Sequence, residues 1–232
     1  GECTSLRSVC IPKDVETGSM TGMLGGDVGP FYGCTSLKNI QFAKGTTVIH
    51  NGLFHASGIE QIKIPDTVTK IENNVFKRCN QLKDVTLSDS VTELGNGAFQ
   101  ECIKLTSIYI PKNIKTSNFA GDDAWNPAPF TGCSELKTIQ FAKGTTDISR
   151  SLLRNTGLEK IELPDTIKNV GEYAFAGCEN LEEVKLANGT EQLKKYAFKD
   201  SALKEIELPR SIKTIGIGAF LNCKNLSKVT LS

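Results

Sequence analysis

The chain has 232 residues, and its 27 Lys and Arg against 26 Asp and Glu give a formal net charge of +1. This balance argues against nucleic acid or an anionic membrane surface as the main partner. Hydrophobic residues make up 39% of the chain, enough for a folded core. No apolar run is long enough to span a membrane in this segment.

A short repeat runs along the whole chain, with the pattern Cys-x-x-Leu-x-x-Ile-x-Leu-Pro followed by Ala-Phe. Its first position, which we call the cysteine slot, is occupied in chain order by Cys3, Cys34, Ser57, Cys79, Cys102, Cys133, Thr156, Cys178, Ser201 and Cys223. Nine full repeats and the start of a tenth therefore fill residues 1–232, which we expect to form a single solenoid domain. The segment from Gln41 to Thr47 recurs 99 residues later, which indicates duplication of a four-repeat block.

Each repeat predicts one short β-strand, because alternate residues are apolar and a strand points alternate side chains to opposite faces. Strands that repeat in one direction stack in parallel, so the sequence predicts a parallel sheet of about ten short strands. One outward column should hold, in chain order, Cys10, Gln41, Lys63, Thr86, Tyr109, Gln140, Glu162, Lys185, Glu207 and Thr230. The other should hold Ser8, Asn39, Gln61, Asp84, Ser107, Thr138, Lys160, Glu183, Glu205 and Lys228.

Phenylalanine recurs once in the return path of almost every repeat, and the stacked rings should fill the interior opposite the sheet. The rings expected in this column are Phe31, Phe54, Phe76, Phe99, Phe130, Phe175, Phe198 and Phe220, with Leu153 in the remaining place.

These motifs, seen complete from Ser201 to Cys223, resemble the BspA-like (Treponema pallidum type) leucine-rich repeat family. The resemblance covers essentially the whole chain. It implies an α/β solenoid, a right-handed leucine-rich-repeat superhelix, on bacterial or protist cell surfaces. It also implies adhesion to host or microbial proteins, and therefore an extracellular or cell-surface location.

The cysteine slot accepts Ser57, Thr156 and Ser201 freely, so we expect a ladder of half-buried thiols that satisfy turn backbone groups. A disulfide between neighbouring slots remains an alternative. Cys10 stands outside the slot, at an outward strand position, and is expected to be exposed.

Catalytic chemistry has little support in the sequence. His50 and His55 lack a nucleophile and carboxylate at a recognisable spacing, so we expect two solvent-facing histidines and no enzyme. Asp122 and Asp123 could hold a cation weakly, but an acidic loop tip is the favoured interpretation. No metal or cofactor is expected.

The expected binding residues lie on the outward surface and in two insertions. Tyr109 is the one outward aromatic near the middle of the sheet, where an aromatic anchor could bind a protein. The segments 15–31 and 114–130 are each eight residues longer than their counterpart at 68–76. Insertions in solenoids commonly gather on the binding face. They carry or adjoin the remaining candidates, Met20, Met23, Tyr32, Phe119 and Trp125.

An alternative is that these apolar residues only cover the underlying core. Neither end of the sequence has the polar cap that terminal repeats need, so we expect a fragment of a longer array. The favoured function is a non-enzymatic protein-binding module of an adhesin-type protein, which binds a host or microbial surface protein. The alternative function is a passive stalk that spaces another domain from the cell surface.

Overall fold

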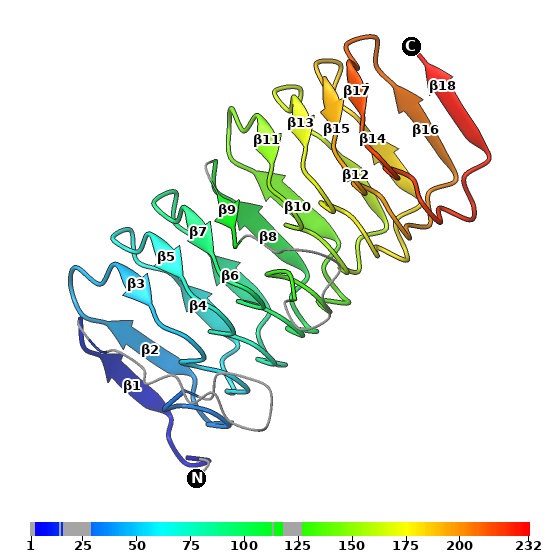
Figure 1. Ribbon diagram of the computed structural model, residues 1–232. Helices are drawn as coiled ribbons and strands as arrows, with labels where there is room; N and C mark the ends of the chain where they lie inside the picture. The colour runs from blue at the N-terminus through cyan, green and yellow to red at the C-terminus, as the bar shows by residue number, and fades with distance from the viewer. Residues whose placement is uncertain (1–2, 14, 16–28, 113, 118–126) are drawn as a thin grey trace.

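The computed structural model describes residues 3–13, 15, 29–112, 114–117 and 127–232. The chain winds into coils that stack in sequence order from the N-terminus to the C-terminus (Figure 1). Each coil brings residues about one repeat apart in the sequence side by side, so the spacing of the repeat sets the architecture. The extent of the domain over residues 1–232 and its place in a longer array stay predictions.

The longer strands form one row along the stack (Figure 1). They are β1 (Ser8–Ile11), β2 (Asn39–Phe42), β4 (Gln61–Lys63), β6 (Asp84–Thr86), β8 (Ser107–Ile110), β10 (Thr138–Phe141), β12 (Lys160–Glu162), β14 (Glu183–Lys185), β16 (Glu205–Leu208) and β18 (Lys228–Leu231). All pair in parallel, and the register sets Tyr109 beside Gln140 and Glu162 beside Lys185. The parallel arrangement and the outward columns are thus confirmed. Hydrogen bonding joins the strands in two-stranded sheets, β1–β2, β4–β6, β8–β10, β12–β14 and β16–β18, and not in one continuous sheet.

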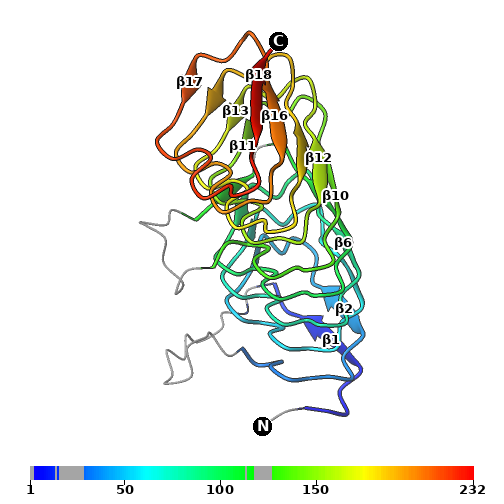
Figure 2. The same cartoon turned by 90° about the vertical axis from the view of Figure 1, so that its right-hand side faces the viewer.

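A second row of two-residue strands lies on another side of the coil; Figure 2 shows β13 and β17 opposite β10 and β12. These strands are β3 (Val48–Ile49), β5 (Lys70–Ile71), β7 (Glu93–Leu94), β9 (Lys115–Thr116), β11 (Asp147–Ile148), β13 (Asn169–Val170), β15 (Gln192–Leu193) and β17 (Thr214–Ile215). They form two parallel sheets, β3–β5–β7–β9 and β11–β13–β15–β17. The sequence analysis missed them, because two residues are too few to show an alternating pattern.

The break in the second row falls between β9 and β11, at the coil that carries the second insertion. Side chains connect the two coils there. The Thr116 hydroxyl donates to the carbonyl oxygen of Arg150 at 2.6 Å. The Ser149 hydroxyl donates to the carbonyl oxygen of Ile114.

The α/β class implied by the family resemblance is not confirmed, because the described residues contain no helix. The return path consists of turns. Residues with positive φ recur four positions apart in most coils, as at Asn74 and Arg78 and again at Gly97 and Glu101. A right-handed helix cannot continue through such left-handed residues, so the chain turns instead.

The phenylalanine column is confirmed. Ring centroids of neighbouring coils lie 5.9 Å apart for Phe31 and Phe54, 5.1 Å for Phe76 and Phe99, and 5.4 Å for Phe99 and Phe130, in stacked arrangements. The column resumes at Phe175 after Leu153, which is fully buried in the intervening coil. Such offset stacks of large rings account for much of the apolar surface that the coil buries.

The thiol ladder is also confirmed, with one correction. The Cys79 Sγ donates to the carbonyl oxygen of Phe54 at 3.1 Å, and Cys102, Cys133 and Cys178 make the equivalent bond in their coils. These four thiols are fully buried and not half-buried, because the slot points into the core beside the phenylalanine column. All eight cysteines are free thiols, and Cys10 is exposed as predicted. Burial raises the pKa of Cys79 and of Cys133 to about 12.

Candidate interaction surface

The middle of the longer-strand row is a neutral, hydrogen-bonding surface centred on Tyr109 of β8. Its exposed neighbours, which we call together with Tyr109 the central strip, are Thr86, Ser107, Thr138 and Gln140. The Tyr109 hydroxyl donates to Asp89 Oδ1 at 2.5 Å, and this hydrogen bond raises the pKa of Tyr109. The bond fixes the ring, so a partner that contacts it has little side-chain freedom left to remove.

An ion pair lies on either side of the central strip. Toward the C-terminus, Lys185 Nζ lies 2.5 Å from Glu162 Oε1, as the alternating signs of this column predicted. Toward the N-terminus, Lys38 Nζ lies 2.5 Å from Glu60 Oε1 and lowers the pKa of that carboxyl. Binding a partner on these flanks would require the removal of water from charges that already have partners.

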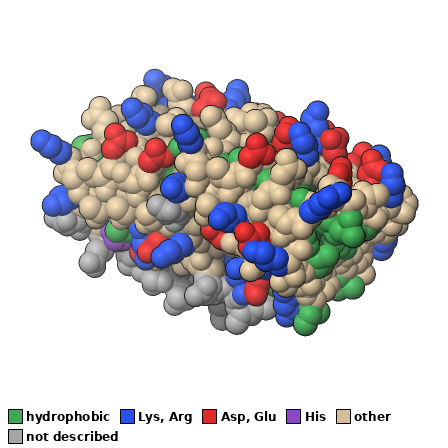
Figure 3. All heavy atoms as spheres, turned by 90° about the horizontal axis from the view of Figure 1, so that it is seen from above, with side chains coloured by type: hydrophobic (Ala, Val, Ile, Leu, Met, Phe, Trp, Pro, Cys, Tyr) green, Lys and Arg blue, Asp and Glu red, His purple; other side chains and the backbone are tan. Residues whose placement is uncertain are grey.

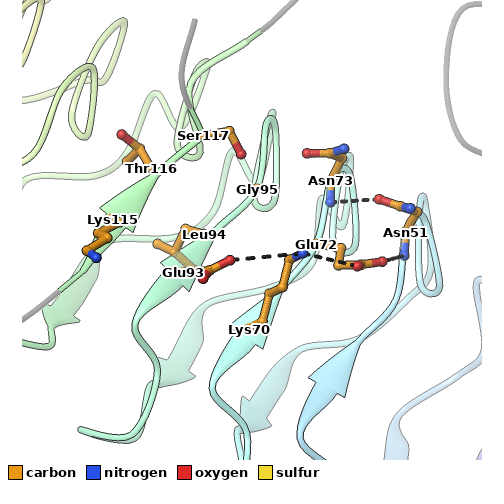
Figure 4. Close-up of a pocket in the computed structure, with 10 residues that line it drawn as sticks. All are labelled: Asn51, Lys70, Glu72, Asn73, Glu93, Leu94, Gly95, Lys115, Thr116 and Ser117. Carbon is orange, nitrogen blue, oxygen red and sulfur yellow. Dashed lines mark hydrogen bonds and ion pairs between the residues drawn. The ribbon is translucent and has the colours of Figure 1, made fainter. Parts of the chain in front are cut away.

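A hollow of about 350 Å³ lies on the outer face of β5, β7 and β9 (Figure 4). Glu72 lines it between Lys70 and Asn51: Oε2 accepts a hydrogen bond from the Asn51 backbone nitrogen at 3.2 Å, and Oε1 lies 3.4 Å from Lys70 Nζ. Lys70 in turn lies 3.9 Å from Glu93 Oε2. Gly95 also lines the hollow, and a Cβ there would lie 2.5 Å from the backbone carbonyl carbon of Glu72, so glycine allows the close approach of the two coils. Ser117, at the rim, directly precedes the second insertion.

An asparagine ladder crosses the coils beside this hollow. The Oδ1 of Asn51 accepts from the backbone nitrogen of Asn73 at 3.0 Å, and the Oδ1 of Asn73 accepts from that of Asn96 at 2.8 Å (Figure 4 shows the first of these). Sequence analysis missed this ladder. Its signal was an asparagine three residues before Phe54, Phe76 and Phe99.

The prediction of two solvent-facing histidines is wrong for His55, which is only 6% exposed. The Tyr32 ring covers it edge-on, with the two ring centroids 5.0 Å apart. His50 is half-buried, and its Nδ1 lies 3.3 Å from Glu72 Oε2. His55 directly follows the fully buried Phe54 of the phenylalanine column.

Tyr109 and Tyr32 are the candidate binding residues that the structure places, on the longer-strand row and in the turn before Cys34 respectively. They lie on different parts of the coil, so the structure does not bring them together. Met20, Met23, Phe119 and Trp125 lie outside the described residues, as do Asp122 and Asp123.

Over the described ranges, no three residues among His, Cys, Asp and Glu are grouped closely enough to hold a metal ion. The same part of the chain has no helix with the length and apolar character needed to cross a membrane.

Solved structures of bacterial leucine-rich repeat proteins share this fold. A Bacteroides ovatus protein matches at 24% identity with a TM-score of 0.54, over 99% of this chain and 75% of its own. A Eubacterium ventriosum protein matches at 25% identity with a TM-score of 0.60, over 94% of this chain and 59% of its own. The pneumococcal vaccine antigen PcpA matches at 22% identity with a TM-score of 0.51, over 97% of this chain and 62% of its own.

The chain thus spans about 60% of the length of two of these relatives. No curated protein matches it. The family described as BspA type leucine rich repeat region matches residues 27–123 and 126–232 in six copies. Together with the coil geometry, this match shows that the chain belongs to the BspA-type leucine-rich repeat family.

Proposed function

We propose that the chain is a non-enzymatic protein-binding module of an adhesin-type protein that is secreted or held at the cell surface. Leucine-rich repeat domains generally mediate protein interactions, and such repeat proteins are generally non-enzymatic scaffolds. The proposed partner is a protein on a host or microbial surface. The extracellular location rests on membership of the family, whose solved relatives include a pneumococcal vaccine antigen.

The central strip is the observation that carries the proposal. A tyrosine whose hydroxyl is held by Asp89 stands among the exposed hydroxyl and amide groups of Thr86, Ser107 and Gln140. Tyrosine supplies a large amphipathic contact area, and hot spots of protein interfaces are enriched in it. Neutral neighbours lose less hydration free energy than charges do when a partner covers them. A partner would therefore bind more favourably here than over the paired charges on the flanks.

The insertions are the second part of the proposed surface. Met20, Met23 and Tyr32 lie in or beside the first insertion, and Phe119 and Trp125 lie in the second. The hollow around Glu72 and Gly95 adjoins the start of the second insertion at Ser117. Ser117, the last described residue before the second insertion, lines this hollow, so the hollow is included in the proposed surface.

The test measures binding of the immobilised chain to a panel of purified host and bacterial surface proteins. The double variant Tyr109→Ala with Trp125→Ala should weaken binding by roughly tenfold or more, as expected for the loss of two aromatic anchors. The control variant Glu207→Ala with Thr230→Ala changes the same outward column toward the C-terminus and should bind like the wild type.

A passive stalk is the alternative function, and it predicts a different result. For a stalk, adhesion by the full-length protein would be the same with and without Tyr109 and Trp125. An enzymatic function would be indicated by a hydrolase activity that disappears in His50→Ala or His55→Ala, and that result would contradict the proposal.

A further inference from the structure

A second polar surface lies in the turns that follow β11, β13 and β15, away from the central strip. It consists of Tyr173 and Tyr196 with Arg150, Arg154, Lys195 and Lys199, and we call it the tyrosine–cation surface. Neighbouring coils are in direct contact here. The Tyr173 backbone nitrogen donates to the Lys195 carbonyl oxygen at 3.1 Å, and the Tyr196 nitrogen donates to the Ile217 carbonyl oxygen at 3.1 Å.

Both tyrosines occupy a backbone position that favours a smaller residue. Their φ angles are +55° and +57°, in the left-handed region. The same coil position holds Gly52, Asn74, Gly97 and Gly218 elsewhere in the stack, also with positive φ. Glycine and asparagine adopt this conformation at lower cost than tyrosine, so two successive tyrosines here work against local backbone preference.

Phe175 and Phe198 form the core column of these coils, with their ring centroids 5.3 Å apart and no exposed surface. The ring centroids of Tyr173 and Tyr196 lie 5.0 Å apart. Tyr173 is only 4% exposed and Tyr196 is half-buried, so the two rings form a platform that a partner reaches through the cations around it and not through the Tyr173 ring.

Four cations surround this platform. The Cζ atoms of Arg150 and Arg154 each lie 5.6 Å from the centroid of the Tyr173 ring. The Nζ of Lys195 lies 4.9 Å from the centroid of the Tyr196 ring, and that of Lys199 lies 5.7 Å from it. Such cation–π contacts hold long side chains in place over a ring.

Positive charge exceeds negative charge among the described residues of this surface. Lys194 adds a fifth, exposed cation. Two carboxylates accompany the five: Glu172, whose Oε2 lies 2.7 Å from an Arg150 nitrogen, and Asp200, whose Oδ2 lies 3.5 Å from Lys199 Nζ. A surface with this excess attracts an anionic partner.

Apolar side chains adjoin the cations in the next coil. Ile217 is 77% exposed and Leu221 is 43% exposed in the last coil of the stack, which has a neighbouring coil on one side only, and their coil positions correspond to those of Lys195 and Lys199. Seen from above, hydrophobic side chains gather at this end of the stack, whereas charged side chains of both signs are spread along the rest of the face (Figure 3).

We propose that the tyrosine–cation surface binds an acidic segment of a protein partner. Carboxylates of the segment bind the exposed Lys194 and Lys195, and its apolar side chains contact Ile217 and Leu221. The guanidinium groups of Arg150 and Arg154 offer planar, paired donors that suit further carboxylates. This surface is separate from Tyr109, so it adds a second contact region to the proposed binding module.

A protein segment fits these features better than other polyanions do. A sulfated polysaccharide would match the cations but has no apolar groups for Ile217 and Leu221. An anionic membrane would bring lipid phosphates against Glu172 and Asp200, whereas a peptide can place its own acidic residues away from these two carboxylates.

The test selects peptides from a random displayed dodecamer library on the wild-type chain, with counter-selection on the double variant Lys194→Gln with Lys195→Gln. The control variant, Lys44→Gln with Lys143→Gln, removes the same charge from two exposed turns of the longer-strand row. Peptides that survive should be rich in Asp and Glu with interspersed apolar residues. They should bind the double variant about tenfold more weakly than the wild type, and bind the control variant like the wild type. Thermal unfolding of all three proteins shows whether the variants keep the fold.

A second variant tests the sign of the effect. Glu172→Gln with Asp200→Asn removes the two carboxylates and should strengthen binding of the same peptides. Three outcomes would each overturn the proposal. The first is a lack of acidic enrichment in the selected peptides, the second is an equal fall of their affinity in the double variant and the control, and the third is an unchanged affinity in Glu172→Gln with Asp200→Asn. A different result with other polyanions would also overturn it. In that result, heparin or vesicles with 30% phosphatidylserine bind the wild type but not the double variant, whereas the selected peptides bind neither protein. Tyr109→Ala should leave peptide binding unchanged, so failure here is distinguishable from failure of the central strip.

Discussion

The two halves of the stack use the same coil but place different side chains on its outer positions. From β3 to β9, the turns carry an asparagine ladder that bonds one coil to the next, and the phenylalanine column is continuous. From β11 to β17, the ladder position holds Arg150, Glu172 and Lys195, and Leu153 interrupts the column. The first half therefore satisfies its own backbone more fully. The second half offers more charge to a partner.

The largest expected difference concerns the column itself. Phe99 is fully buried and stacks on Phe76 and Phe130, so Phe99→Ala should lower the free energy of unfolding by about 3–5 kcal/mol. Phe220, at the end of the column, is only partly buried, so Phe220→Ala should lower the free energy of unfolding by less than Phe99→Ala does. Urea denaturation of both variants measures the difference. Equal costs would contradict a stacked column.

A leucine variant makes this comparison sharper. Leu153 shows that leucine can occupy the column, so Phe99→Leu should cost roughly 1.5 kcal/mol or less. A cost as large as that of Phe99→Ala would mean that the rings, and not apolar volume, hold the coils together.

Alkaline pH should destabilise both halves of the stack, because each contains buried thiols. Burial raises the pKa of Cys79 and Cys133 to about 12, whereas an unfolded thiol titrates near pH 9. The unfolded chain therefore binds fewer protons between these values, and stability falls by about 1.4 kcal/mol per pH unit for each thiol as pH rises from 9 toward 12.

The serine variants provide the control for the alkaline experiment. Ser57 and Ser201 occupy the same slot, so Cys79→Ser with Cys133→Ser should fold. Its free energy of unfolding should depend less steeply on pH above 9 when measured by urea denaturation at each pH. An unchanged slope would show that the buried thiols do not cause the loss.

The asparagine ladder gives a smaller difference. Asn73→Ala removes the acceptor of the Asn96 backbone nitrogen and should cost about 1 kcal/mol. Glu172→Ala, at the equivalent position of the second half, removes a half-exposed ion pair with Arg150 and should cost only a few tenths of a kcal/mol, roughly. Amide exchange of Asn96 should also become faster in Asn73→Ala. Equal costs for the two variants would remove the distinction between the halves.

Much of the fold follows from the spacing of the repeats. A fixed period places each Phe, each cysteine slot and each outward residue beside its counterpart in the next coil, so the register of Tyr109 with Gln140 could be predicted. The second row of strands could not be predicted, because Val48–Ile49 and its counterparts are too short to alternate. The helix implied by the family is not present among the described residues, because left-handed residues such as Asn74 interrupt each return path.

Less of the candidate site could be predicted. Tyr109 was identified from its outward position, but its partner Asp89 lies in the turn of the preceding coil, where the pattern of apolar residues gives no information. The burial of His55 depends on Tyr32, which precedes it by about one repeat. Tyr173 and Tyr196 occupy equivalent positions of successive repeats, and an alignment of the coils would have shown them together.

Alkylation of individual cysteines tests the central claim most directly, namely that recurring positions form the interior and departures from the pattern lie on the surface. Native protein would be treated with iodoacetamide, and the modification of each cysteine followed by mass spectrometry. Cys10 should react readily, whereas Cys79, Cys102, Cys133 and Cys178 should stay protected until the chain is unfolded. Reaction of these four thiols as fast as Cys10 in the native protein would contradict the stacked coil.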